Sequence, residues 1–182
     1  MIKLGNAPVY VINDFLSAED IAEGVKIIED QEKARGRDSL NLAKVFGLKT
    51  CSMTDIVVDY IKRMSDKVIV KHDAEIVTQS ATLGIWYTGS KCPLHTDNPN
   101  DWNNMLTHSS VVYLNNDFSG GTINFPEYNV EYAPKVGDLV IFKADIQHEV
   151  TTITSGKRYT LALWHTTNMK LDMFEKRKNG KG

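Results

Sequence analysis

The second half of the chain is a succession of short segments with the pattern of β-strands. Residues 81–87 alternate between two kinds of side chain, which is the two-residue period of a strand whose faces differ. Further β-branched or apolar runs follow, separated by turns rich in Asn, Gly and Pro: 109–114, 122–125, 130–133, 138–142, 148–153 and 159–164. The last two runs are expected to be joined by a turn at Thr154–Lys157. About seven short strands with no helix between them predict an antiparallel sandwich or barrel.

The first part of the chain carries helix patterns instead, after a short strand at 9–12. Ser17 followed by Asp20 is typical of a helix start, and apolar residues then recur at helical spacing within 21–28. A second candidate cap at Ser52–Asp55 precedes another apolar stripe, formed by Val57, Ile61, Met64 and Val68. Residues 35–50, broken by two glycines, are expected to be a loop with room for one helical turn. The helical layer, about 14–76, is expected to cover the sheet rather than bind a cofactor.

The residues with the chemistry of a metal site lie in the strand-rich part. His95 and Asp97 are two residues apart, so both side chains point to one face of an extended strand. His148, at the start of a distant strand, supplies a second imidazole. Two imidazoles and one carboxylate are the facial ligand set of non-haem Fe(II) oxygenases, which leaves positions open for a co-substrate and O2. Arg158 follows on the next strand, where a guanidinium suits a dicarboxylate co-substrate because it can grip a carboxylate bidentately.

The remaining histidines and the cysteines lack such a context. His72, His108 and His165 have no partner at ligand spacing, and we expect them to be structural. Cys51 and Cys92 form neither a disulfide framework nor a zinc pattern, so both are expected to be free thiols in a reducing compartment. Cys92 is expected to be a small buried filler.

The order of the motifs resembles the 2-oxoglutarate and Fe(II)-dependent oxygenases, specifically the prolyl 4-hydroxylase branch. The matching motifs are Asp14–Ser17, Tyr87 with Gly89, His95–Asp97, Val112–Asn115, Gly120–Thr122, Phe125–Pro126, Pro134–Asp138, Phe142, His148, Arg158–Thr160 and Trp164. Several motifs in family order are more specific than any one of them. The resemblance implies a mainly β fold, the double-stranded β-helix or jelly roll, with the N-terminal helices packed on the outside of its major sheet.

The resemblance also implies roles for individual residues. The metal ligands would be His95, Asp97 and His148, which bind Fe(II), and an intact Asp97 favours hydroxylation over halogenation. Four residues would serve 2-oxoglutarate: Arg158 holds its distal carboxylate, Thr160 and Tyr113 add hydroxyl groups to that carboxylate, and Trp164 lines the pocket. Many relatives carry a tyrosine three residues before the first iron ligand, where this chain has Cys92, and Tyr87 is the candidate to supply that contact.

The implied reaction is hydroxylation of a prolyl residue, at C4, in a peptide or protein. It would consume 2-oxoglutarate and O2 and release succinate and CO2, with ascorbate as reductant. Trp102, in the polar loop 97–105, is the candidate to pack on the substrate's pyrrolidine ring. Two alternatives stay open: the same chemistry on a free amino acid or other small molecule, and a non-catalytic jelly-roll binding module.

Length and composition limit the size, partners and location expected for this protein. The chain has 182 residues, 42% hydrophobic and 24% charged, with a formal net charge of −2. We therefore expect one domain over 1–182, with a jelly-roll core at about 79–166 and a basic, solvated tail at 167–182. Nothing indicates a nucleic-acid partner, a membrane partner, a signal peptide or a membrane span, so a cytoplasmic monomer or weak dimer is the expectation.

Overall fold

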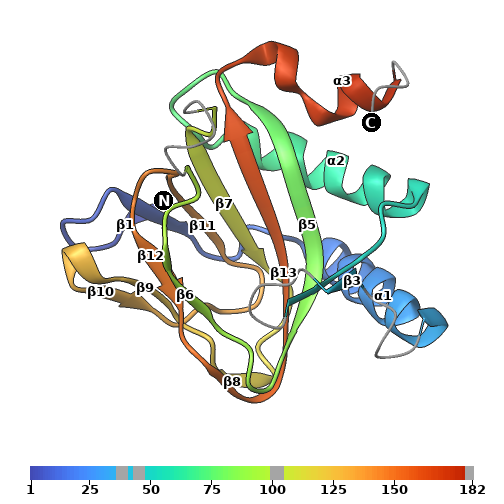
Figure 1. Cartoon of the computed structure of the whole chain (residues 1–182), viewed down its shortest axis with the longest axis horizontal. Coiled ribbons are helices and arrows are strands. Elements are labelled where there is room, and N and C mark those ends of the chain that lie inside the picture. Colours follow the sequence, from blue (N-terminus) through green and yellow to red (C-terminus); the bar gives the residue numbers. More distant parts are fainter. Residues whose placement is uncertain (36–40, 43–47, 99–104, 179–182) are drawn as a thin grey trace.

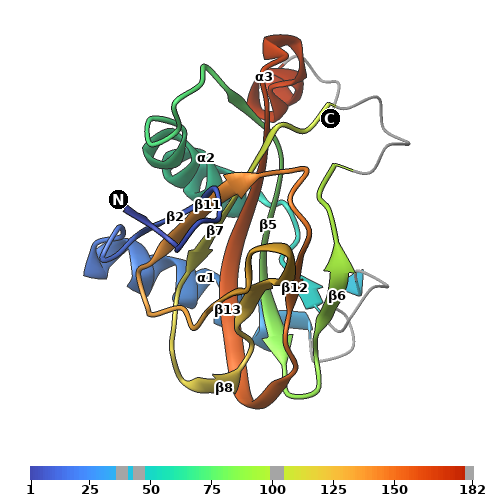
Figure 2. The same ribbon diagram turned by 90° about the vertical axis from the view of Figure 1, so that its left-hand side faces the viewer.

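Two antiparallel β-sheets form the body of the molecule (Figures 1 and 2). This computed structural model describes residues 1–35, 41–42, 48–98 and 105–178. In the described residues the major sheet has the strand order β1 (Ile2–Lys3), β2 (Val9–Ile12), β11 (Leu139–Lys143), β7 (His108–Tyr113), β13 (Ile153–Thr166), β5 (Val77–Tyr87), β4 (Leu48–Thr50) and β3 (Asn41–Leu42), and β8 (Phe118–Gly120) also pairs with β13. The minor sheet has the order β10 (Val130–Tyr132), β9 (Ile123–Phe125), β12 (His148–Val150) and β6 (Cys92–His95). This is the expected jelly roll.

Helices α1 (Ala18–Arg35) and α2 (Asp55–Ile69) cover the outer face of the major sheet, on the side away from β6, β9 and β12 (Figure 1). The predicted cap of α1 is present: Asp20 N–H donates to Ser17 Oγ, and Ser17 N–H donates to the Asp20 carboxylate. Helix α2 instead starts after Thr54, because the Ser52 backbone is bonded to the Gln31 side chain. No helix in the described part of the chain is long and apolar enough to span a membrane.

An apolar core lies on each face of the major sheet. The outer core, between sheet and helices, includes the predicted α2 stripe, Val57, Ile61, Met64 and Val68, each 0% exposed. The inner core, between the two sheets, includes Tyr113, Phe125 and Phe142. Burying each large apolar side chain contributes about 1.5–3 kcal/mol. The inner core fixes the spacing between the sheets, and the functional side chains lie in that space.

The segment expected to be a loop contributes two strands where it is described. Strand β4 pairs with β5, and β3 pairs with β4, which extends the major sheet. The close approach of β4 explains Gly84, because a Cβ atom there would lie 2.5 Å from the Lys49 carbonyl oxygen. The expected helical turn falls partly on residues 36–40 and 43–47, which lie outside the described residues.

The predicted turn at Thr154–Lys157 lies within β13, which extends from Ile153 to Thr166 and pairs with β8 and β5. Gly156 has a positive φ of 78° there, and the chain reverses direction beside β8 (Figure 1). One expectation about the C-terminal half is wrong, because the tail is not simply solvated. It forms the short 3-10 helix η3 (Met169–Leu171) and helix α3 (Met173–Lys178), and Phe174 is buried in the outer core.

The three histidines without ligand spacing form a polar cluster on the outer face of the major sheet. Ser110 Oγ lies 2.9 Å from Nε2 of His72 and 2.9 Å from Nε2 of His165. His165 Nδ1 is 3.1 Å from Thr78 Oγ1, and the His72 and His108 rings are 5.2 Å apart. Burial lowers the pKa of His72 to about 4 and that of His165 to about 3. These imidazoles are therefore neutral at pH 7.

This cluster predicts that the protein loses stability in mild acid. The unfolded chain binds protons near the usual histidine pKa, about 6.5, whereas folded His72 and His165 resist protonation until about pH 4 and 3. Stability is therefore full above pH 6.5 and falls as the pH drops below it. The expected loss is on the order of 1–2 kcal/mol for each of these two histidines between pH 7 and pH 5.

Urea unfolding at the two pH values, for the parent and for His72→Gln, measures this effect. Because the side-chain amide of glutamine does not titrate, the free energy of unfolding of the variant should change less between pH 7 and pH 5 than that of the parent. An identical difference in the two proteins would contradict the assignment.

Candidate active site

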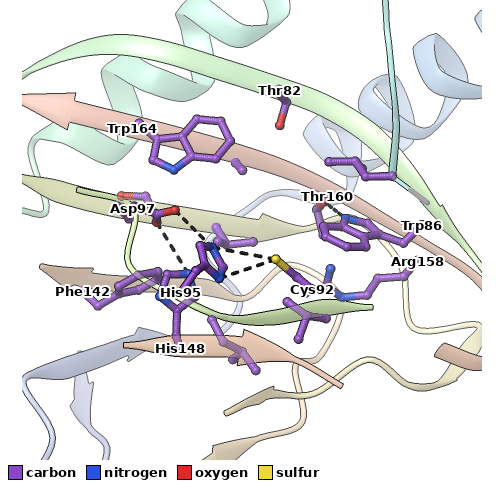
Figure 3. Close-up of a pocket in the computed structure, with 17 residues that line it drawn as sticks. Thr82, Trp86, Cys92, His95, Asp97, Phe142, His148, Arg158, Thr160 and Trp164 are labelled. Atoms are coloured by element: carbon purple, nitrogen blue, oxygen red, sulfur yellow. Dashed lines mark hydrogen bonds and ion pairs between the residues drawn. The ribbon is translucent and has the colours of Figure 1, made fainter. Parts of the chain in front are cut away.

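The minor sheet brings the two predicted imidazole ligands together. His95 ends β6 and His148 begins β12, and the two are directly paired in the antiparallel register, with ring centroids 4.3 Å apart. Asp97, just beyond β6, places its carboxylate oxygens 3.5 Å from His95 Nε2 and 3.6 Å from His148 Nε2 (Figure 3). One ligand atom from each residue lies within 4.8 Å of the others, so the three can converge on a single metal ion.

Backbone carbonyls orient both imidazoles. His95 Nδ1 lies 2.9 Å from the Pro93 carbonyl oxygen, and His148 Nδ1 lies 3.0 Å from that of Ile146. A carbonyl oxygen only accepts, so each Nδ1 carries a proton and Nε2 is the nitrogen that can bind a metal. The Phe142 ring, 4.6 Å from His148, packs beside the site. This ligand set and its outer support fit Fe(II).

The three ligands also perturb one another electrostatically. The Asp97 carboxylate, with a smaller effect from Cys92, raises the pKa of His95 to about 10. Burial raises the pKa of Asp97, but His95 and His148, together with the side chains of Ser109 and Trp164, outweigh it, and the net pKa is lowered. Burial lowers the pKa of His148. Asp97 is thus ionised beside a protonated His95, and a metal ion that binds here displaces that proton.

The facing major sheet contributes a buried guanidinium and a hydroxyl group. Arg158 is 2% exposed and Thr160 4% exposed, both on the face of β13 that lines the cavity. The Arg158 guanidinium lies 4.9 Å from the centre of the Tyr113 ring. Arg158 Nε and the Tyr113 hydroxyl are buried without a hydrogen-bond partner in the described structure. Leaving such groups unpaired costs about 1–3 kcal/mol each, which a ligand carboxylate would recover.

One cavity of about 230 Å³ joins the two ends. It is lined by all three predicted metal ligands and by three of the predicted co-substrate residues, Arg158, Thr160 and Trp164. Tyr113 contacts Arg158 from the inner core. The structure therefore brings these seven predicted residues together.

The other candidates have different positions. Tyr87 points away from the cavity, and its hydroxyl lies 2.6 Å from the Glu32 carboxylate, so β5 presents the neighbouring Trp86 to the site instead. Cys92 is half-buried and lines the cavity, with Sγ 3.6 Å from His95 Nδ1, rather than filling a core. Trp102 lies outside the described residues.

Sequence reasoning missed several residues of the site. Trp86 shares its strand face with Thr82, and strand alternation alone would have assigned it to that face. A second cavity of about 480 Å³ shares Thr82, Asp97 and Trp164 with the first. Gln79 and Asn98 also line it, and each has a buried carboxamide oxygen with no hydrogen-bond partner in the described structure.

Comparison with known proteins agrees with this geometry. Residues 82–166, which hold the triad, Arg158 and Thr160, match the 2OG-Fe(II) oxygenase superfamily, where 2OG is 2-oxoglutarate. The chain resembles a 2OG-Fe(II) oxygenase of the prolyl hydroxylase type. The resemblance to 2OG-Fe(II) oxygenases and the fitted ligand set together support Fe(II) and 2-oxoglutarate as the groups for this site.

The curated relatives match this chain over only a short segment. Human prolyl 3-hydroxylase 3 is 41% identical in an alignment of length 66 that covers 32% of this chain and 9% of that protein. A putative prolyl 4-hydroxylase from Acanthamoeba polyphaga mimivirus is 33% identical in an alignment of length 64 that covers 30% of this chain and 26% of that protein. The chain thus spans only a small part of the curated relatives that it matches.

Solved structures share the fold over most of the chain. A Pseudomonas putida prolyl-4-hydroxylase has a TM-score of 0.67 at 20% identity, covering 88% of this chain and 93% of that one. A prolyl hydroxylase from Trichoplax adhaerens, solved in complex with a hypoxia inducible factor oxygen degradation domain peptide fragment, has a TM-score of 0.68 at 17% identity, covering 93% and 87%. At these identities the likeness shows the jelly-roll fold alone.

Proposed function

We propose that this chain is a 2-oxoglutarate- and O2-dependent hydroxylase that acts on prolyl residues in a peptide or protein and releases succinate and CO2. One observation carries the proposal: a single cavity holds the His95–Asp97–His148 triad at one end and, at the other, a buried Arg158 whose Nε has no hydrogen-bond partner among the described residues. That spacing of a facial triad and a carboxylate-binding guanidinium suits a 2-oxo acid with a second carboxylate.

Each part of the site then has a defined task. Bound Fe(II) and 2-oxoglutarate supply the oxidising power that inserts oxygen from O2 into a C–H bond. Arg158, Thr160 and Tyr113 hold the distal carboxylate and so orient the co-substrate toward the triad. The backbone bonds to the two Nδ1 atoms leave Nε2 as the metal-binding nitrogen of each imidazole. Ascorbate would serve as an external reductant.

The charge of the two cavities favours a peptidyl substrate over a free amino acid. Among the described residues that line them, the ionisable side chains are the triad, Arg158 and Cys92. A free amino acid carries an ammonium and a carboxylate, and burying them without partners is costly. The carboxamides of Gln79 and Asn98 instead offer neutral donors and acceptors, which match the N–H and C=O of a peptide group.

The position of hydroxylation on the ring is a separate question. We assign C4, in line with the prolyl 4-hydroxylase-like motifs. The similar proteins include both prolyl 3-hydroxylases and prolyl 4-hydroxylases, so the two products are to be distinguished by fragmentation of the modified residue.

Succinate release in the presence of alternative substrates tests the substrate class. With Fe(II), ascorbate and 2-oxoglutarate, we expect blocked proline-containing peptides to accelerate succinate release at least about tenfold over the slow uncoupled rate, while free proline should not, because burying its two charges costs more than 1.4 kcal/mol. Peptides that are identical except for alanine in place of proline are the matched control. Acceleration by free proline alone would overturn the peptide assignment in favour of a small-molecule hydroxylase.

A further inference from the structure

Trp86 makes two contacts at the carboxylate-binding end of the cavity. It is 9% exposed on β5 and lies directly opposite Arg158 in the register with β13. Its ring is 5.3 Å from the Arg158 guanidinium carbon. Its Nε1 donates a hydrogen bond to Thr160 Oγ1 over 3.1 Å, and Figure 3 shows the three side chains grouped together.

The direction of this hydrogen bond determines where the hydroxyl proton of Thr160 can point. Because an indole N–H can only donate, Thr160 Oγ1 must be the acceptor, and its own proton points elsewhere. No hydrogen bond connects that proton to an acceptor in the described residues, and Thr160 lines the cavity beside Arg158. The hydroxyl is therefore set to donate into the cavity, toward the space where Arg158 would hold a carboxylate.

We propose that Trp86 is a positioning residue for the co-substrate, which orients the Thr160 hydroxyl as a donor to the distal carboxylate of 2-oxoglutarate. The inference rests on the proposed function, because it requires 2-oxoglutarate as the ligand. Trp86 also restrains Arg158, whose guanidinium carbon lies 5.3 Å from the centre of the Trp86 ring and 4.9 Å from that of Tyr113.

Trp86 shares this end of the cavity with a small side chain, Cys92. Cys92 and Trp86 line the same cavity, and Figure 3 places both beside Arg158. Tyr87 does not enter this space, since its hydroxyl is bonded to Glu32 on the other side of β5. Trp86 is thus the aromatic donor at this end of the site.

The test is the binding of two 2-oxo acids to the Fe(II)-loaded protein under anaerobic conditions, measured by calorimetry. Trp86→Phe keeps a ring over Arg158 but removes the N–H donor. We expect 2-oxoglutarate to bind this variant about 3- to 10-fold more weakly than the parent, the effect of one neutral hydrogen bond. Binding of 2-oxobutyrate, which lacks the distal carboxylate, should be unchanged.

A double-mutant cycle with Thr160→Val separates positioning from packing. If Trp86 acts through Thr160, adding Trp86→Phe to Thr160→Val should cause little further loss of 2-oxoglutarate affinity. Equal losses for both 2-oxo acids, additive losses in the cycle, or unchanged affinity in Trp86→Phe would overturn the inference alone. A parent protein that binds Fe(II) but no 2-oxoglutarate would overturn the proposed function with it.

Discussion

Replacing His148 with alanine is expected to reduce Fe(II) affinity at least about 100-fold and to abolish hydroxylation. Changes in residues that only support a metal ligand already cost about 10- to 100-fold, and His148 is itself one of the three proposed ligands. Its imidazole is buried and pre-oriented by the Ile146 carbonyl, so no neighbouring group can take its place without rearrangement. Anaerobic calorimetry with Fe(II), and with Mn(II) as an oxidation-resistant substitute, measures the affinity directly.

His108→Ala is the matched control for this variant. His108 is a half-buried imidazole on the outer face of the major sheet, where its Nδ1 is bonded to Thr107. It lies in the histidine cluster and not in the cavity, so its removal should leave Fe(II) binding unchanged. Equal Fe(II) affinity in the parent and His148→Ala would show that the triad is not the metal site.

Replacing Arg158 with glutamine is expected to weaken 2-oxoglutarate binding at least about 30-fold while Fe(II) still binds. Truncating one partner of a buried, hydrogen-bonded charge pair costs on the order of 2–5 kcal/mol. Burial lowers the pKa of Arg158, but a guanidinium stays protonated in proteins, so the cavity keeps its positive charge in the parent. Glutamine can form a neutral hydrogen bond but supplies neither the charge nor the bidentate geometry.

Lys157→Gln tests whether the effect requires this particular cation. Lys157 is the preceding residue of β13, and its ammonium forms an ion pair with Glu32 at 2.7 Å, on the other face of the strand. Its loss should leave 2-oxoglutarate affinity unchanged. If Lys157→Gln and Arg158→Gln weakened binding equally, the general positive charge of the strand, and not the guanidinium in the cavity, would be responsible.

Local patterns were sufficient to predict the parts of the site that depend on one strand or helix. The two-residue spacing of His95 and Asp97, and of Arg158 and Thr160, places each pair on one strand face without knowledge of the fold. The α2 stripe was predicted in the same way, because helical periodicity is local. The family motifs then supplied the order in which these pieces come together.

Features that depend on pairing between distant segments were not predicted. Residues 48–50 have no strong strand pattern, and they form β4 because β5 offers an edge and Gly84 allows a close approach. The turn at Thr154–Lys157 was predicted, but its pairing with β8 and β5, which places it within β13, was not. The choice of Trp86 over Tyr87 for the cavity depended on one step of strand register, which sequence alone leaves open.

The three histidines of the outer face also form a feature that depends on distant segments and was not predicted. His72, His108 and His165 are far apart in the chain and follow no motif, and tertiary packing alone gathers them around Ser110. The interpretation of each as structural was made for each residue separately, so it could not foresee a shared cluster or its effect on acid stability.

Turnover of a proline-containing peptide in isotopically labelled O2 tests the central claim most directly. The protein would be supplied with Fe(II), ascorbate and 2-oxoglutarate, and the peptide and succinate would be analysed by mass spectrometry. We predict that the prolyl residue gains one labelled oxygen atom for each succinate formed, and that His148→Ala gives neither product. Peptide that stays unmodified without any succinate, in protein shown to contain Fe(II), would contradict the account.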